Sequence, residues 1–223
     1  MLVPIEWLND YIDLKDIDTV EFCDRMIMSG SNLETCEHFC EEMENVLVGR
    51  IEKIERHPDA DKLVVCQINV GQEEPVQIVT GAPNVFEGAL VPVAMHKSRI
   101  PGPLHGKAKE EGGTKITKGK LRGVTSYGML CSAEELGFED KVVPVAHKEG
   151  IWILEEDFEP GMDFAEALGL KQAVVDFEIT PNRPDCLAMV GMAREAAATF
   201  DRPFSYPDTQ LEEAGEKEAK DFV

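Results

Sequence analysis

The sequence predicts an α+β fold, in which a small five-stranded β-barrel is inserted into a mixed α/β domain formed by the two flanking segments. Residues 45–125 contain short β-favouring runs separated by turns rich in glycine and proline. The flanks mix helical spacing with short strands, and neither has enough apolar surface for a domain of its own. We therefore expect a discontinuous flanking domain, 1–40 plus 150–202, around a barrel at 41–149. An acidic linker at 203–223, partly disordered, completes the chain.

The N-terminal segment is predicted to be helical over about 4–30. The apolar residues from Trp7 to Ile12 have helical spacing, and Pro4 suits a first helical turn. Asp18 or Thr19 can cap a second helix, which we expect to end at Ser29-Gly30.

Five strands are expected in the central region, at 46–55, 63–70, 75–80, 90–94 and 120–124. Within the first strand the apolar spacing slips by one residue between Val48 and Ile51, which predicts a β-bulge or a strong bend. A long loop at 98–118, basic and rich in glycine, separates the last two strands. Short strands with one such loop are typical of a Greek-key barrel of the OB type.

The C-terminal flank is predicted to contain short strands at 151–154 and 174–179 and a short helix at 164–168. A longer helix rich in alanine and methionine is expected at 186–200, with Asp185 as its N-cap.

The turn His57-Pro58-Asp59-Ala60-Asp61-Lys62 follows the first predicted strand. Pro58 fixes φ, and the two aspartates can cap backbone N–H groups. One interpretation is that His57 and Asp61 only hold this hairpin together. The other is that the adjoining cations face a phosphate backbone; these are Arg50, Lys53, Arg56 and Lys62. We expect the turn to be structural and its neighbours to bind.

A second basic motif, about sixty residues later, contains Lys118, Lys120 and Arg122 in alternation. A strand would put the three cations on one face, as a surface that follows a phosphate backbone requires. Gly128 allows close approach of the backbone, and Ser126 can donate a hydrogen bond to a phosphate. The alternative is a solvated basic strand without a ligand.

The net charge of −21 is unevenly distributed. Residues 45–125 hold 12 Lys and Arg against 9 Asp and Glu, whereas the rest holds 10 against 34. A neutral-to-basic middle therefore lies inside an acidic frame, and local placement of cations decides phosphate binding. Because the surplus is small, we expect this region to bind weakly and with strong salt dependence.

Aromatic residues and catalytic motifs are scarce. Only Phe86 and Tyr127 are aromatic between 45 and 135, which favours recognition of folded RNA by shape and backbone over stacking on single-stranded bases. The sequence has neither GxxxxGK[ST] nor HExxH. We expect no metal site at Cys36-x-His38-x-Cys40 and a packed thiol at Cys131. We expect no catalytic residue, no membrane span and no DNA partner.

Several segments resemble a known family. HPDADKL, IVTGAPNV and KGKLRGVTSYGMLCSAEELG resemble the tRNA-binding OB domain shared with endothelial-monocyte-activating polypeptide. The flanks PIEWLNDYIDL and FEITPNRPDCLAMVGMAREAAA are similar to the N-terminal part of bacterial phenylalanyl-tRNA synthetase beta subunits. The motif positions that carry the resemblance are His57, Pro58, Asp61, Asn84, Gly128 and Met129.

The resemblance implies an N-terminal fragment of a longer, cytoplasmic beta subunit. In that family the alpha subunit holds the synthetic active site, which attaches phenylalanine to tRNA(Phe) with ATP and Mg²⁺ within an α2β2 heterotetramer. The fragment would bind no cofactor and would position tRNA(Phe). Two alternatives are a protein-interaction scaffold of the tetramer and a free-standing, chaperone-like tRNA-binding protein.

Overall fold

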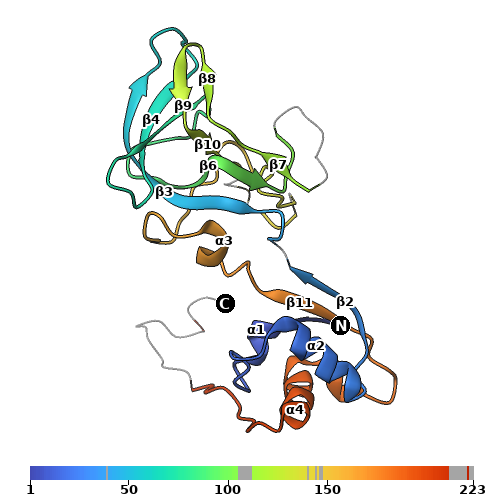
Figure 1. Cartoon of the computed structure of the whole chain (residues 1–223). Coiled ribbons are helices and arrows are strands. Elements are labelled where there is room, and N and C mark those ends of the chain that lie inside the picture. Colours follow the sequence, from blue (N-terminus) through green and yellow to red (C-terminus); the bar gives the residue numbers. More distant parts are fainter. Residues whose placement is uncertain are drawn as a thin grey trace. The chain divides into compact units, whose positions relative to one another are not determined.

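The computed structural model describes residues 1–38, 40–104, 112–139, 141–143, 145, 148–210 and 220. The chain divides into two compact units (Figure 1). Unit 1 combines Met1–Glu37 with Gln172–Val223, and unit 2 is His38–Lys171. Both units contain strands and short helices. In the described strand pairs that have an assigned register, the strands run antiparallel. The predicted mixed α and β class is confirmed at this level.

Unit 1 contains a sheet whose strands lie in the order β1-β11-β2. Its strands are β1 (Leu2–Pro4), β2 (Leu33–His38) and β11 (Ala173–Phe177). Its helices are α1 (Ile5–Leu8), α2 (Thr19–Met28), the 3-10 helix η2 (Pro184–Leu187) and α4 (Met189–Phe200). Phe22 of α2 stacks on Phe200 of α4 with ring centroids 5.8 Å apart. The two helices therefore bury one shared apolar core, which Val175 and Phe177 of β11 extend.

The sequence predicted the N-cap of α2 correctly but not that of α4. The Asp18 carboxylate accepts a hydrogen bond from the Glu21 N–H at 2.9 Å, so the predicted cap of α2 is confirmed. The predicted Asp185 cap is wrong, because α4 begins only at Met189 and Ala188 is its N-cap. Asp185 instead lies in η2, whose backbone packs directly against α4 at Gly191. A Cβ at Gly191 would lie 1.8 Å from the Asp185 carbonyl oxygen.

Unit 2 is built on long antiparallel strands. They are β3 (Glu44–Arg56), β4 (Val64–Asn69), β5 (Val76–Thr80), β6 (Leu90–Ile100) and β10 (Gly128–Leu130). Within the described residues they follow the order β10-β6-β3-β4-β5, and β7 (Thr114–Lys115) adds to β6. β8 (Gly119–Leu121) and β9 (Val124–Ser126) form a separate hairpin. The apolar faces of β3, β4 and β6 supply most of the core.

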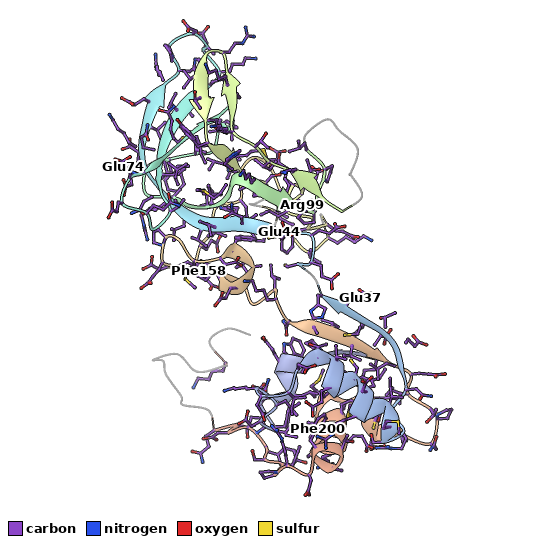
Figure 2. All side chains as sticks on the ribbon, viewed as in Figure 1. Glu37, Glu44, Glu74, Arg99, Phe158 and Phe200 are labelled. Atoms are coloured by element: carbon purple, nitrogen blue, oxygen red, sulfur yellow. The ribbon has the colours of Figure 1, made fainter. Side chains whose placement is uncertain are left out.

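Strand β3 is irregular. Its register against β4 shifts between Ile51 and Lys53, and its register against β6 shifts between Glu44 and Val46. At the second irregularity Glu44 lies opposite Arg99 of β6 (Figure 2). A bulge was predicted between Val48 and Ile51, but the register is regular there and the shift against β4 follows Ile51. The change in apolar spacing arises because Val48 and Ile51 belong to two different core clusters. Bulges of this kind bend a strand, so β3 can pair with neighbours along its whole length.

A closed five-stranded barrel is not confirmed. β10 and β5 stand at opposite ends of the strand order, and no ladder joins them among the described residues. The Tyr127 N–H donates to the Gln77 carbonyl at 3.0 Å where such a ladder would run. The predicted strand at 120–124 is also wrong: Arg122 and Gly123 have φ of 46° and 91°, which turns the chain into the β8–β9 hairpin.

The segment 150–171 belongs to unit 2, whereas the sequence predicted it in the flanking domain. Leu154 bridges to Leu90 of β6, and Phe164 of α3 (Phe164–Ala167) lies in the core cluster that contains Val46. Its apolar side chains therefore belong to the core of unit 2.

The predicted linker begins as packed chain. Phe204 stacks on Tyr11 with ring centroids 6.0 Å apart, and the Ser205 N–H donates to the Tyr11 carbonyl. The prediction of partial disorder covers 203–223, of which residues 211–219 and 221–223 lie outside the described residues. In the part of the chain that is described, no helix has the length and apolarity needed to span a membrane.

Candidate nucleic-acid interface

The turn between β3 and β4 is organised by His57. Its ring is buried, with 5% exposure. Nδ1 accepts a hydrogen bond from the Asp59 N–H at 3.1 Å, which makes Nε2 the protonated nitrogen. Nε2–H donates to the Leu121 carbonyl at 3.0 Å. The turn is therefore capped by the imidazole, whereas the sequence favoured aspartate caps, and Pro58 and Asp61 are exposed.

The three alternating cations do not share a strand face. Lys118 precedes β8, Lys120 lies within it, and Arg122 lies in the hairpin turn with a positive φ. The prediction of one cationic strand is therefore wrong. All three side chains are nevertheless exposed. Arg122 lies in the turn of the β8–β9 hairpin, Lys120 lies in the middle of β8, and Lys118 lies at the base of the hairpin, where its N–H donates to His96 Nδ1. The three charges are therefore carried by one hairpin.

The His57–Leu121 hydrogen bond joins the two basic motifs of the sequence. It places the β3–β4 turn beside the tip of the β8–β9 hairpin, and Figure 1 shows both at the same end of unit 2. Five exposed cations lie on or beside the β3–β4 turn and along the β8–β9 hairpin, and they form no ion pair within the described ranges; they are Arg56, Lys62, Lys118, Lys120 and Arg122. We call this surface the cationic tip. Asp59 and Asp61 are its acidic neighbours.

Two predicted cations on β3 are already paired. Arg50 Nη2 lies 3.1 Å from Asp157 Oδ1, and Lys53 Nζ lies 2.9 Å from Glu55 Oε1. Both pairs are exposed, so each contributes at most about 1 kcal/mol to stability and exchanges readily with solvent. The two residues are therefore weaker candidates for phosphate contact than those of the cationic tip.

Beside the cationic tip, a row of polar side chains crosses the sheet, and no local pattern in the sequence indicates it. Gln67 Nε2 donates to Gln77 Oε1 at 3.3 Å, and Gln77 Nε2 donates to the Thr125 carbonyl at 2.7 Å. Tyr127 follows β9 and is 47% exposed. This polar row links β4, β5 and β9 into one surface that offers hydrogen bonds and one aromatic ring.

Ser126 is structural. Its side chain is buried; the hydroxyl accepts a hydrogen bond from the Val79 N–H at 3.0 Å and donates to the Gly128 carbonyl at 2.9 Å. It is therefore unavailable to a phosphate, contrary to our expectation. At Gly128 an added Cβ would lie 2.3 Å from the Ala94 carbonyl oxygen, and Met129 packs against the core.

Asn84 clamps two segments of unit 2 together. Its Nδ2 donates to the Ile151 carbonyl at 2.8 Å, and its Oδ1 accepts from the Ile151 N–H at 3.0 Å. This two-way bond substitutes for one pair of a strand ladder, so the motif position Asn84 has a structural role.

The thiols and acids offer little chemistry. Burial is the main cause that raises the pKa of the Cys131 thiol well above its ordinary value, which suits a packed side chain and not a nucleophile. Across the residues that the structure describes, no group of three or more Cys, His, Asp or Glu could hold a metal ion.

Comparison with known proteins agrees with this geometry. A family model described as a putative tRNA-binding domain matches residues 46–163, more than half of the chain. The chain belongs to this tRNA-binding domain family. The matched region contains both turns of the cationic tip and the polar row beside them.

Relatives extend the similarity to the flanks. The chain is 50% identical over 204 residues to the phenylalanine--tRNA ligase beta subunit of Clostridium acetobutylicum, covering 92% of this chain and 24% of that protein. It is 47% identical over 223 residues to that of Clostridium tetani, covering 100% and 26%. The resemblance to beta subunits is thus confirmed, and the chain spans about a quarter of their length.

Among solved structures, the C-terminal domain of Plasmodium vivax p43 is 29% identical over 41% of this chain and 46% of that chain, with a TM-score of 0.29. A score this low adds nothing to the assignment of the fold.

Proposed function

We propose that the cationic tip binds the phosphate backbone of tRNA and that the chain is the tRNA-positioning region of a phenylalanine–tRNA ligase beta subunit. The observation that carries this proposal is the His57–Leu121 hydrogen bond, which holds two cationic turns together at one end of unit 2. Unit 2 contains most of the region that matches the tRNA-binding domain family. Each turn alone offers two or three charges. Together they bring five cations to one region of unit 2, and contact with successive phosphates needs several cations close together.

We further propose that unit 2 is of the OB type, with β3, β4, β5, β6 and β10 as its five strands. OB folds bind nucleic acid on the face of strands 2 and 3 and through the loops that follow strands 1 and 4. Here these loops are the His57 turn and the segment that carries the β8–β9 hairpin. The polar row on β4 and β5 occupies the corresponding strand face.

The charge balance sets the strength of the interaction. The cationic tip has five cations against Asp59 and Asp61, a small surplus on an acidic chain. Each phosphate that is neutralised releases counterions, so binding should weaken steeply with salt. Among the described residues of unit 2, two aromatic rings are exposed, Phe86 and Tyr127; they give little stacking surface, which favours folded RNA over single strands.

The larger assembly is part of the same proposal. The relatives are named phenylalanine–tRNA ligase beta subunits, and by analogy the whole protein would take part in ligating phenylalanine to tRNA(Phe). ATP and Mg²⁺ would be bound by other parts of the enzyme, the alpha subunit would complete an α2β2 assembly, and the enzyme would work in the cytoplasm. This chain would contribute neither a synthetic nor an editing active site.

The test compares two triple variants with the same change in charge. Lys118, Lys120 and Arg122 are changed to Ala in one, and the exposed Lys15, Lys141 and Lys148 in the other. Binding of a tRNA(Phe) transcript is measured at several salt concentrations, with duplex DNA as competitor. The first variant should lose affinity and salt dependence, and the second should change little. Equal effects would show that only net charge matters and would contradict the site.

A protein-interaction role is the second candidate, because unit 1 exposes large apolar side chains. Trp7 is 57%, Val20 is 70% and Met28 is 86% exposed. If tRNA binding is undetectable while deletion of this region abolishes assembly of the ligase, the scaffold role replaces the tRNA role.

A further inference from the structure

Gln67 of β4 carries a half-buried amide that its neighbour across the sheet holds in place. It stands opposite Gln77 of β5 in the strand register, and its Nε2 donates to Gln77 Oε1 at 3.3 Å. Gln77 in turn donates from its own Nε2 to the Thr125 carbonyl at 2.7 Å. Both ends of the Gln77 amide are therefore in use, and Gln77 is a positioning residue for Gln67.

The Gln67 amide keeps unused hydrogen-bonding capacity. A glutamine side chain has two N–H donors and one carbonyl oxygen that accepts. One N–H of Gln67 is bonded to Gln77, and within the described ranges its side chain forms no other hydrogen bond. The oxygen Oε1 and the second N–H belong to one planar group and are available to a ligand. A matching ligand presents a donor and an acceptor side by side.

We propose that Gln67 recognises the edge of one unpaired adenine in the bound RNA, an inference that rests on the proposed function of the cationic tip. Adenine carries its N6 amino donor next to an acceptor nitrogen, N1 on one edge and N7 on the other, and a glutamine amide pairs with such an edge through two hydrogen bonds. Proteins recognise the bases of folded RNA where these are unpaired, in loops, bulges and ends.

The surroundings of Gln67 suit a nucleotide. Thr125, at the other end of the polar row, is paired with Lys120 in the β8–β9 hairpin, so the row connects Gln67 to the cationic tip. The Tyr127 N–H donates to the Gln77 carbonyl at 3.0 Å, and the Tyr127 ring is 47% exposed. An exposed ring can stack on a base of any identity. The cationic tip would thus hold phosphates, Tyr127 would supply stacking, and Gln67 would select the base.

The test uses RNA stem-loops that share one stem and differ only in a loop of adenines, guanines, cytidines or uridines. Their affinities for the whole chain are measured at one salt concentration. The unchanged chain should bind the adenine loop at least about fivefold more tightly than the others, the lower end expected for one two-bond contact to a base. Gln67→Ala should remove this preference and keep the affinity for the uridine loop, which also shows that the variant is folded.

Three further variants separate the roles of the residues. Gln77→Ala leaves the Gln67 amide present but unheld, so it should lower the preference for adenine. Tyr127→Ala should weaken binding of all four loops, because stacking does not depend on base identity. Gln72→Ala removes an exposed glutamine of the same unit and is the matched control, which should behave as the unchanged chain does.

Three results would overturn this inference: equal affinity of the unchanged chain for all four loops, a preference for another base, and an adenine preference that survives Gln67→Ala. The proposed function is tested separately with Lys118, Lys120 and Arg122 changed to Ala. That variant should bind every loop more weakly and keep the preference for adenine. If the unchanged chain binds none of the loops, the proposed function fails and this inference fails with it.

Discussion

His57 Nε2–H donates a hydrogen bond of 3.0 Å to the main-chain carbonyl of Leu121, and this contact joins two turns that are 64 residues apart in sequence. The other ring nitrogen accepts from the Asp59 N–H, so the buried imidazole uses both of its polar atoms. His57 thus links the hairpin tip to the β3–β4 turn, while Gln77 and Ser126 hold the rest of the hairpin to β5.

Replacing His57 by Ala should therefore loosen both turns. It leaves two backbone groups without their partner, and such a loss costs about 1–3 kcal/mol of the free energy of unfolding. Urea unfolding measures this cost, and tRNA affinity should fall as well, although no cation is removed. The exposed Asp61→Ala serves as the control and should stay within about 0.5 kcal/mol. Unchanged stability in His57→Ala would show that the contact is not structural.

Gly128→Ala should destabilise unit 2. The added Cβ would lie 2.3 Å from the Ala94 carbonyl oxygen, so β10 must move away from β6. Overpacking of this kind costs about 1–3 kcal/mol, which thermal unfolding resolves. Gly119 is the matched position, because nothing lies within 4 Å of its Cβ site. If Gly119→Ala is as damaging as Gly128→Ala, the close approach of the strands is not the cause.

Asn84→Ala should release the segment at Ile151 from the loop that precedes β6. Two hydrogen bonds are removed together, and the unpaired backbone groups of Ile151 cost about 1–3 kcal/mol. Hydrogen exchange at the Ile151 amide reports the opening directly. Asn84→Asp keeps the acceptor for that amide and should protect it better than Ala does; equal exchange in the two variants would argue against the clamp.

The Arg183–Asp185 pair predicts a pH dependence. The hydrogen bond from Arg183 lowers the pKa of Asp185 from 3.8 to about 2. Since the folded-state pKa is depressed, the carboxylate stabilises the fold above about pH 4, and this contribution is lost as the pH falls toward 2. Carboxyl NMR should show the Asp185 titration near 2. In Arg183→Gln the pKa should return toward 3.8, and a titration that stays near 2 would contradict the pairing.

The sequence predicted features that depend on a few neighbouring residues. Asp18 three residues before Glu21 is sufficient to predict the cap of α2. It also indicated the family, because the motif around His57 and the flanking segments are each distinctive. These inferences need no knowledge of where distant segments pack.

The mispredicted features have local and long-range causes. Alternation of Lys118, Lys120 and Arg122 predicted a strand, but Arg122 and Gly123 both have a positive φ and form a two-residue turn. The Asp185 cap failed because residues 184–187 form η2 and α4 begins only at Met189. Asp157 pairs with Arg50 across 107 residues, and Ser126 is buried by β5; neither has a local signal in the sequence.

The central claim is that both turns of the cationic tip form one phosphate-binding site. The most direct measurement is the salt dependence of tRNA(Phe) binding for three variants. The first has Arg56 and Lys62 changed to Ala, the second has Lys120 and Arg122 changed to Ala, and the third combines all four. Each double variant should lower the slope of log affinity against log salt, by about 0.9 for each phosphate that the protein no longer neutralises, and the combined variant should lower it further. A slope that is unchanged when either pair is removed would contradict the claim.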